Sequence, residues 1–165
     1  MNRHILEKVD IVSAIIPQSI TAARTGDVVS MKNYGRCAIV FFKDAGTNGD
    51  DVTLTVEQCT SVAPSNAKNL TFTRVDVKQG TLTAEGTWTE VTQSAGATYT
   101  NTDLGGEQAI IVIDIKAEDL DLANGYDCVR LSSSDVGTNA QVGCALYIMH
   151  EPRYAKAGGV SAIAD

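Results

Sequence analysis

The most apolar stretch of the chain is a run of six residues, Cys37–Phe42, between the charged residues Arg36 and Lys43. A run of this length that is rich in β-branched and aromatic residues predicts a strand buried on both faces. A second stretch, Ala109–Ile115, has the same character. We expect these two strands to lie at the centre of a β-sandwich.

Strict alternation of apolar and polar residues predicts further strands that are buried on one face only. Val52–Cys59 alternates aliphatic residues with threonine and glutamate, and Gln141–Glu151 places Leu146 and Tyr147 on opposite faces. The other expected strands are Val9–Ile16, Val28–Lys32, Leu70–Lys78, Thr81–Glu85, Gly86–Thr92 and Tyr126–Ser132.

Glycine, proline and asparagine mark the connections between these strands. Pro17 is expected to stop the first strand, and Gly26-Asp27 is expected to form a turn. The short connection Asn33-Tyr34-Gly35 predicts a hairpin between Val28–Lys32 and Arg36–Lys43. The expected loops are Asp44–Asp51, Ser61–Asn69, Gln93–Gly106 and Ser133–Asn139, and the expected single helical turn is Ala117–Asp121.

The pattern predicts one all-β domain over residues 1–165, a two-sheet antiparallel β-sandwich that is jelly-roll-like and has about eight or nine strands. The two ends are expected to be extended arms. Residues 1–16 form an N-terminal arm that includes the first strand, and residues 152–165 form a C-terminal tail. The tail is small and contains glycine, so it cannot build a core of its own.

Composition narrows the possible partners. The formal net charge is −7 and the isoelectric point is near 4.7. An acidic surface repels phosphate backbones, so we expect no direct contact with nucleic acid. No apolar run approaches the length of about 18 residues that a membrane span needs, and the N-terminus lacks the apolar segment of a signal peptide. We therefore expect no membrane contact and synthesis in a cytosol.

The sequence offers no recognisable catalytic, cofactor or metal motif. The four cysteines share no CxxC spacing and lie in strand-like sequence, which predicts buried, reduced thiols. The two histidines, His4 and His150, accompany no G-x-S-x-G elbow. The carboxylates near Asp119 and in Asp44–Asp51 are expected to be solvated turn residues, because neither group follows a calcium-loop spacing. We expect no enzyme activity, cofactor or bound metal.

Several stretches together resemble a family of small virion proteins of tailed bacteriophages, the head decoration or cement proteins. The stretches that carry this resemblance are Gly26–Arg36 with the apolar strand after it, Thr53–Gln58, Gly86–Thr89, Ala109–Ile115 and Glu151–Ala155. The resemblance covers most of the chain as a pattern and includes no catalytic signature.

The resemblance implies a β-sandwich or jelly roll that sits on the capsid surface and bridges subunits of the major capsid protein. It also implies a homo-oligomer on the capsid and a protein that is made in the host cytoplasm. The two ends would lie on neighbouring subunits and add strand pairing or hydrophobic anchoring. The candidate subunit or lattice contacts are Ile5, Leu6, Trp88, Tyr154 and Ile163.

Three other functions remain open at this point. A tail or head–tail connector protein is a second virion role for a small β protein. A carbohydrate- or ligand-binding sandwich would gather Trp88, Tyr99 and Tyr126 in one surface groove. An enzyme would need a water-excluding cleft around His150 with a carboxylate in reach.

Overall fold

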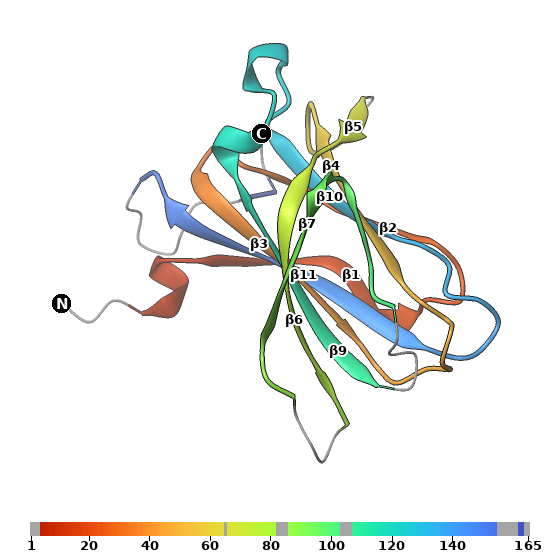
Figure 1. Cartoon of the computed structure of the whole chain (residues 1–165). Helices are drawn as coiled ribbons and strands as arrows, with labels where there is room; N and C mark the ends of the chain where they lie inside the picture. The colour runs from red at the N-terminus through yellow and green to blue at the C-terminus, as the bar shows by residue number, and fades with distance from the viewer. Residues whose placement is uncertain (1–3, 65, 82–85, 103–106, 155–161, 164–165) are drawn as a thin grey trace.

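The computed structural model describes residues 4–64, 66–81, 86–102, 107–154 and 162–163, and it folds these into two antiparallel sheets (Figure 1). The strands are β1 (Asp10–Ser19), β2 (Arg24–Ser30), β3 (Tyr34–Lys43), β4 (Thr53–Cys59), β5 (Ala67–Asn69), β6 (Phe72–Gly80), β7 (Thr89–Gly96), β8 (Thr98–Thr100), β9 (Gln108–Lys116), β10 (Cys128–Ser133) and β11 (Val142–Pro152). The short 3-10 helices are η1 (Ile5–Glu7), η2 (Ala117–Asp119) and η3 (Leu122–Asn124).

The strand order is that of a jelly roll. The six-stranded sheet has the order β1-β11-β3-β9-β6-β7, and the five-stranded sheet has the order β2-β10-β4-β5 with β8 also on β4. The pairs β1–β11, β2–β10, β3–β9 and β4–β5 are nested along the chain, as in a long antiparallel ribbon wound into two layers. The predicted antiparallel sandwich and its jelly-roll character are confirmed, and β6 to β8 are inserted between β5 and β9.

The strand count exceeds the prediction. The described residues form eleven strands, where about eight or nine were expected. Two of them, β5 and β8, are three residues long and lie in polar stretches that were expected to be loops. Both pair with β4, so tertiary context decides their conformation rather than local sequence. Most of the expected strand Thr81–Glu85 lies outside the described residues, and the helical turn at Ala117 is confirmed as η2.

The two apolar runs lie at the centre of the six-stranded sheet, as predicted, because β3 and β9 are its middle strands. The expectation that they are buried on both faces is wrong. Burial alternates along β3 and β9, and the side chain of Phe41 is fully buried whereas that of its neighbour Phe42 is 43% exposed. One face of this sheet covers the core and the other faces outward.

Three local predictions about the first strands are also wrong. Pro17 does not stop β1, which continues to Ser19, because β1 is an edge strand whose irregular register on β11 accommodates a residue without an N–H. Gly26 lies within β2 rather than in a turn. No hairpin joins β2 to β3, because β2 belongs to the five-stranded sheet and β3 to the six-stranded one. Their short connection crosses between layers, which residue spacing alone does not distinguish from a hairpin.

Described residues near both ends of the chain lie against the sandwich. Residues 10–16 of the expected N-terminal arm lie in β1 and pair with β11 rather than extending outward. In the C-terminal tail, Ala162 is fully buried. Its carbonyl accepts a hydrogen bond from the Ser30 N–H at 2.6 Å, and its own N–H donates to the Asp10 carboxylate at 3.3 Å.

Tyr147 links the two layers. It lies on β11 with its side chain fully buried, and its hydroxyl donates a hydrogen bond to the Asp27 carbonyl at 2.8 Å. The same oxygen accepts a hydrogen bond from the Leu131 N–H at 2.8 Å. Burial is the main cause that raises the pKa of Tyr147 above its usual value. This one phenol therefore joins β11 of one sheet to β2 and β10 of the other.

We predict that Tyr147→Phe destabilises the fold by about 1–3 kcal/mol, because the Asp27 carbonyl and the Leu131 N–H lose their shared partner inside the core. Urea unfolding at neutral pH measures this free energy. Tyr154→Phe is the matched control, since Tyr154 is 66% exposed. Equal losses in the two variants would contradict the assigned role of Tyr147.

We also predict that, above about pH 10, the free energy of unfolding falls more steeply with pH in the native chain than in Tyr147→Phe. The raised pKa of Tyr147 keeps the folded phenol protonated above pH 10, where the unfolded phenol ionises. Its contribution is therefore present below about pH 10 and declines above it, by up to about 1.4 kcal/mol per pH unit. Urea titrations between about pH 10 and pH 11.5 measure the two slopes. Equal pH slopes in the two proteins would show that the pKa of Tyr147 is the same in the folded and the unfolded chain.

Candidate interaction surface

An apolar surface covers the outward side of the six-stranded sheet. Residues opposite one another on paired strands share a face, and the register aligns Leu146 with Val40 and Val40 with Val112. The next row aligns Cys144, Phe42 and Ile110 in the same way, and the row beyond the centre aligns Ile11, Ile148 and Ala38. We call these nine residues the outer apolar face.

The outer apolar face is accessible to solvent. Ile11, Phe42 and Leu146 are 47%, 43% and 42% exposed, and the other six members are half-buried. Nine positions, at about 4.8 Å between strands and about 6.8 Å between rows, cover roughly 300 Å². This is the size of the largest apolar patch on a typical soluble monomer, and that patch is often functional.

The charges that border this face are paired with each other. Arg36 donates hydrogen bonds to Asp114, which raises the pKa of the Arg36 guanidinium. Arg74 bonds Asp76 at 2.8 Å and lies 3.0 Å from Glu90. Arg36 and Asp114 form a neutral pair at the margin, whereas Arg74 with its two carboxylate partners, Asp76 and Glu90, forms a cluster with a net charge of −1.

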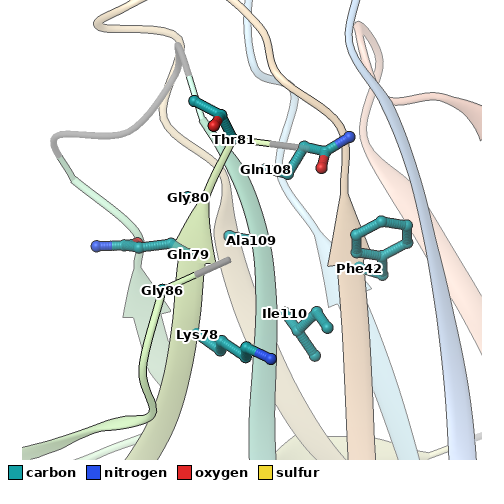
Figure 2. A pocket seen from close by; sticks show the side chains of 9 residues that line it. All are labelled: Phe42, Lys78, Gln79, Gly80, Thr81, Gly86, Gln108, Ala109 and Ile110. Atoms are coloured by element: carbon teal, nitrogen blue, oxygen red, sulfur yellow. The ribbon is translucent and has the colours of Figure 1, made fainter. Parts of the chain in front are cut away.

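The outer apolar face ends in a hollow of about 190 Å³. Figure 2 shows Phe42, Ile110 and Lys78 on three neighbouring strands beside it. The hollow is lined by Phe42, Lys78, Gln79, Gly80, Thr81, Gly86, Gln108, Ala109 and Ile110. Gln108 is held in place by its hydrogen bond to Asp44 at 2.9 Å. An apolar cavity of about 150 Å³ is enough for a benzene ring, so the hollow has room for one large side chain.

The five contacts predicted from the sequence are all more than half exposed. Leu6 and Tyr154 line a shallow depression together with Pro152. Ile5 is adjacent to Leu6, and Ile163 follows the buried Ala162 next to Asp10. These four residues gather where β1 begins and β11 ends, and we call them the end cluster.

Trp88 lies apart from the end cluster. It directly precedes β7, which is the opposite edge of the six-stranded sheet from β1. Five strand spacings separate the two edges, or about 24 Å. At 53% exposure Trp88 is not a core residue. The structure therefore divides the predicted contacts into two places.

Sequence reasoning missed the outer apolar face. Phe42 and Val40 were included in a run interpreted as buried on both sides. The available signal was in β11, where both alternating sets are apolar, one with Leu146 and Ile148 and the other with Tyr147. Two apolar faces on a strand of a two-layer sandwich leave one of them without a covering layer.

The aromatic residues proposed for a glycan groove lie on separate elements. Tyr99 pairs with Leu54 near the start of β4. Tyr126 lies under the ammonium of Lys68, 4.2 Å from the ring centre, and Lys68 pairs with Gln58 near the other end of β4. The two tyrosines are therefore roughly 13 Å apart along the strand direction.

His150 borders the outer apolar face rather than a closed cleft. Its Nε2 lies 3.6 Å from the Asp114 carboxylate, and the side chain of His150 is 30% exposed. The same carboxylate is bonded to Arg36. The arrangement is an open cluster of paired charges.

The cysteines and carboxylates behave as structural groups. Cys37, Cys59 and Cys128 are buried and form no disulfide, as predicted, whereas Cys144 is half-buried on the outer apolar face. Burial raises the pKa of the Cys37 thiol. Asp121 is held by Lys68 and Asn124, and these hydrogen bonds lower its pKa. Among the described residues, no group of three or more histidine, cysteine, aspartate or glutamate side chains is placed to hold a metal ion.

No helix in the described ranges is long and apolar enough to cross a bilayer. No protein-family model matches the chain, and no curated protein matches it. Among solved structures, the chain is similar to the SPBc2 prophage-derived protein YomS, with 12% sequence identity and a TM-score of 0.43. The match covers 85% of this chain and 94% of YomS. A superposition this loose transfers no property of YomS to the chain.

We predict that Phe41→Ala and Phe42→Ala differ sharply in stability although they are neighbours on β3. The side chain of Phe41 is fully buried, so its loss should cost about 3–5 kcal/mol. Phe42 keeps much of its surface in water, so its loss should cost less than about 1.5 kcal/mol. Urea unfolding at low protein concentration compares the two. Similar losses would mean that β3 is buried on both faces.

Proposed function

We propose that this chain is a structural protein of a tailed-bacteriophage virion and that it decorates the capsid by binding the major capsid protein. The end cluster is the observation that carries the proposal. It presents Ile5, Leu6, Tyr154 and Ile163 to solvent at one end of a sandwich whose own core is already filled. Exposed apolar side chains at one end provide contact area without any reacting group.

The resemblance of Gly26–Arg36 and Glu151–Ala155 to decoration proteins supports the same function. Glu151–Ala155 contains Tyr154 of the end cluster, so the resemblance and the exposed apolar residues meet at one place. Many weak contacts suffice for such a protein, because a lattice offers many equivalent sites and binding at several of them adds avidity.

A tail or head–tail connector role is the second candidate within the same class. The copy number distinguishes the two. A decoration protein is present in a fixed ratio to the major capsid protein over the whole shell, whereas a connector is present in a handful of copies. Quantitative mass spectrometry of purified particles measures this ratio.

We predict that Leu6→Ser combined with Tyr154→Ser lowers the affinity for capsids lacking this protein by tenfold or more, which is about 1.4 kcal/mol. Both side chains are exposed in the free protein, so the substitutions should leave folding intact. Co-sedimentation of the purified protein with such capsids measures binding.

Leu122→Ser is the matched control, because Leu122 is 50% exposed and lies in η3, outside the end cluster. If native protein binds and the double variant binds equally well, the end cluster is not the lattice contact. If the native protein does not bind capsids at all, the decoration role is wrong.

A further inference from the structure

We propose that Cys59 and Cys128 are a redox-active pair, which forms a cross-strand disulfide when the chain meets an oxidant. The register of β4 on β10 places the two residues directly opposite each other. Both are fully buried, and they form no disulfide in this structure. The inference concerns thiol chemistry within one chain, so it holds or fails independently of capsid binding.

The pair lies on the outward side of the five-stranded sheet rather than in the core. Side chains alternate between the two faces of a strand, and Val56 and Leu131, which oppose each other in the same register, belong to the core. An odd number of positions separates Cys59 from Val56 and Cys128 from Leu131, so the cysteines lie on the other face. The core includes Cys37 but neither member of the pair. Core packing therefore does not explain why two thiols oppose each other here.

The backbone spacing of the pair is suitable for a disulfide. The Ser134 N–H donates a hydrogen bond to the Thr53 carbonyl, and every second pair along this ladder is of the same type, which includes Cys59 and Cys128. The Cα atoms of such a pair are about 5.5 Å apart, and disulfides most often join Cα atoms at about 5.5–6 Å. The Cβ atoms, about 4.5–5.5 Å apart, need to approach by about 1 Å to reach the usual disulfide distance.

The position of the pair permits this approach. Cys59 is the last residue of β4 and Cys128 is the first residue of β10, so no pair lies beyond them in the described register of these two strands. On the other side of Cys59, the neighbouring strand β5 has only three residues. Strand ends open locally more often than strand centres, which lets a small oxidant reach thiols that are otherwise buried.

Polar groups lie next to both thiols. The Cys128 thiol donates a hydrogen bond to the Asp127 carboxylate at 3.2 Å. Burial raises the pKa of the Cys59 thiol, which keeps this thiol protonated and slows its oxidation at neutral pH. The pair is therefore expected to remain reduced in a reducing cytosol and to be oxidised only outside it.

The oxidant is a low-molecular-weight disulfide such as glutathione disulfide. The thiolate of one cysteine attacks a sulfur of this disulfide, and one glutathione leaves as its thiolate. The second cysteine then loses its proton and attacks the protein sulfur of the mixed disulfide, which releases the second glutathione. Two cysteine thiols are oxidised, one glutathione disulfide is reduced to two glutathione thiols, and the two cysteine protons end on those thiols.

Incubation of the folded native chain in mixtures of reduced and oxidised glutathione at about pH 8.5 tests the proposal. Lys43, Lys116 and Arg130 separate the cysteines along the chain, so trypsin yields peptides with one cysteine each. After alkylation of the remaining thiols, we expect mass spectrometry without reduction to find the Cys59 peptide joined to the Cys128 peptide. Unlinked thiols at both positions in the most oxidising mixture would overturn the proposal.

Oxidation of the same chain in concentrated urea is the control for the folded geometry. An unfolded chain brings its cysteines together at random, so several linkages should form there. In the folded chain the Cys59–Cys128 linkage should be the main product, because Cys37 lies in the core and Cys144 lies on the outer apolar face. A folded chain that gives the same mixture as the unfolded chain would show that the pair is not preorganised, and the proposal would fail.

The disulfide should also stabilise the fold. It would close a loop over residues 59–128, which contains β5 to β9, and a cross-link restricts the unfolded chain more as its loop grows longer. We expect oxidation to raise the melting temperature of the native chain by about 5–15 °C. An unchanged melting temperature would show that no cross-link joins β4 to β10 in the folded chain.

Two variants assign this rise to the pair. Cys59→Ala should abolish the rise, and Cys128→Ala should do the same if Cys59→Ala does not fold. Cys144→Ala is the matched control and should retain the rise, because Cys144 lies on β11 in the other sheet. A rise that persists in the variants of the pair would assign the effect of oxidation to another group and overturn the proposed disulfide.

Discussion

The buried hydroxyl of Tyr147 is the polar contact that fixes how the two sheets meet. Its bonds to the Asp27 carbonyl and the Leu131 N–H join strands of both layers inside the core. Gly26, next to Asp27, makes this approach possible. A Cβ on Gly26 would lie 2.8 Å from the Leu131 carbonyl oxygen and 3.0 Å from that of Ala14. The hydrogen-bonded phenol of Tyr147 and the missing side chain of Gly26 together set the distance from β2 to β10 and β1. Few substitutions are therefore compatible with this corner of the sandwich.

This spacing also determines what is left at the surface. With the layers fixed, the inward residues of β3 and β9, such as Phe41 and Ile111, complete the core between the sheets. Among the described residues, no third layer covers the outward residues of the same strands, such as Phe42 and Ile110. A jelly roll with six strands on one side therefore presents a broad sheet surface, and here that surface is aliphatic and aromatic. The inward residues of these strands are apolar because they form the core, and the apolar outward residues are not explained by the core.

Sequence alone was informative where one physical pattern dominates. Alternation located β4 and β11 to within a few residues, and the apolar runs located the central strands β3 and β9. The sequence was uninformative where contacts with distant segments of the chain decide the local conformation. The residues of β5 become a strand because β4 offers an unpaired edge, and Pro17 is tolerated because β1 lies at an edge. The exposure of Phe42 depends on how many layers the fold has, which no local pattern contains. For the same reason the sequence predicted the contact residues of the end cluster, which lie near the two termini, but missed the outer apolar face.

Energetics set a limit on how tightly the outer apolar face can bind. Burial of the nine apolar side chains against a partner would release free energy in proportion to the accessible apolar area that leaves water. Loss of translational and rotational freedom opposes association by about 4–15 kcal/mol, and ordering of surface side chains adds to that. The quality of the packing, and not the area alone, therefore decides how tightly this face can bind a partner. The acidic remainder of the chain, with its net charge of −7, repels other approaches between copies. An apolar face on an acidic body therefore makes the outward side of the six-stranded sheet the surface where contact with an apolar partner meets the least repulsion.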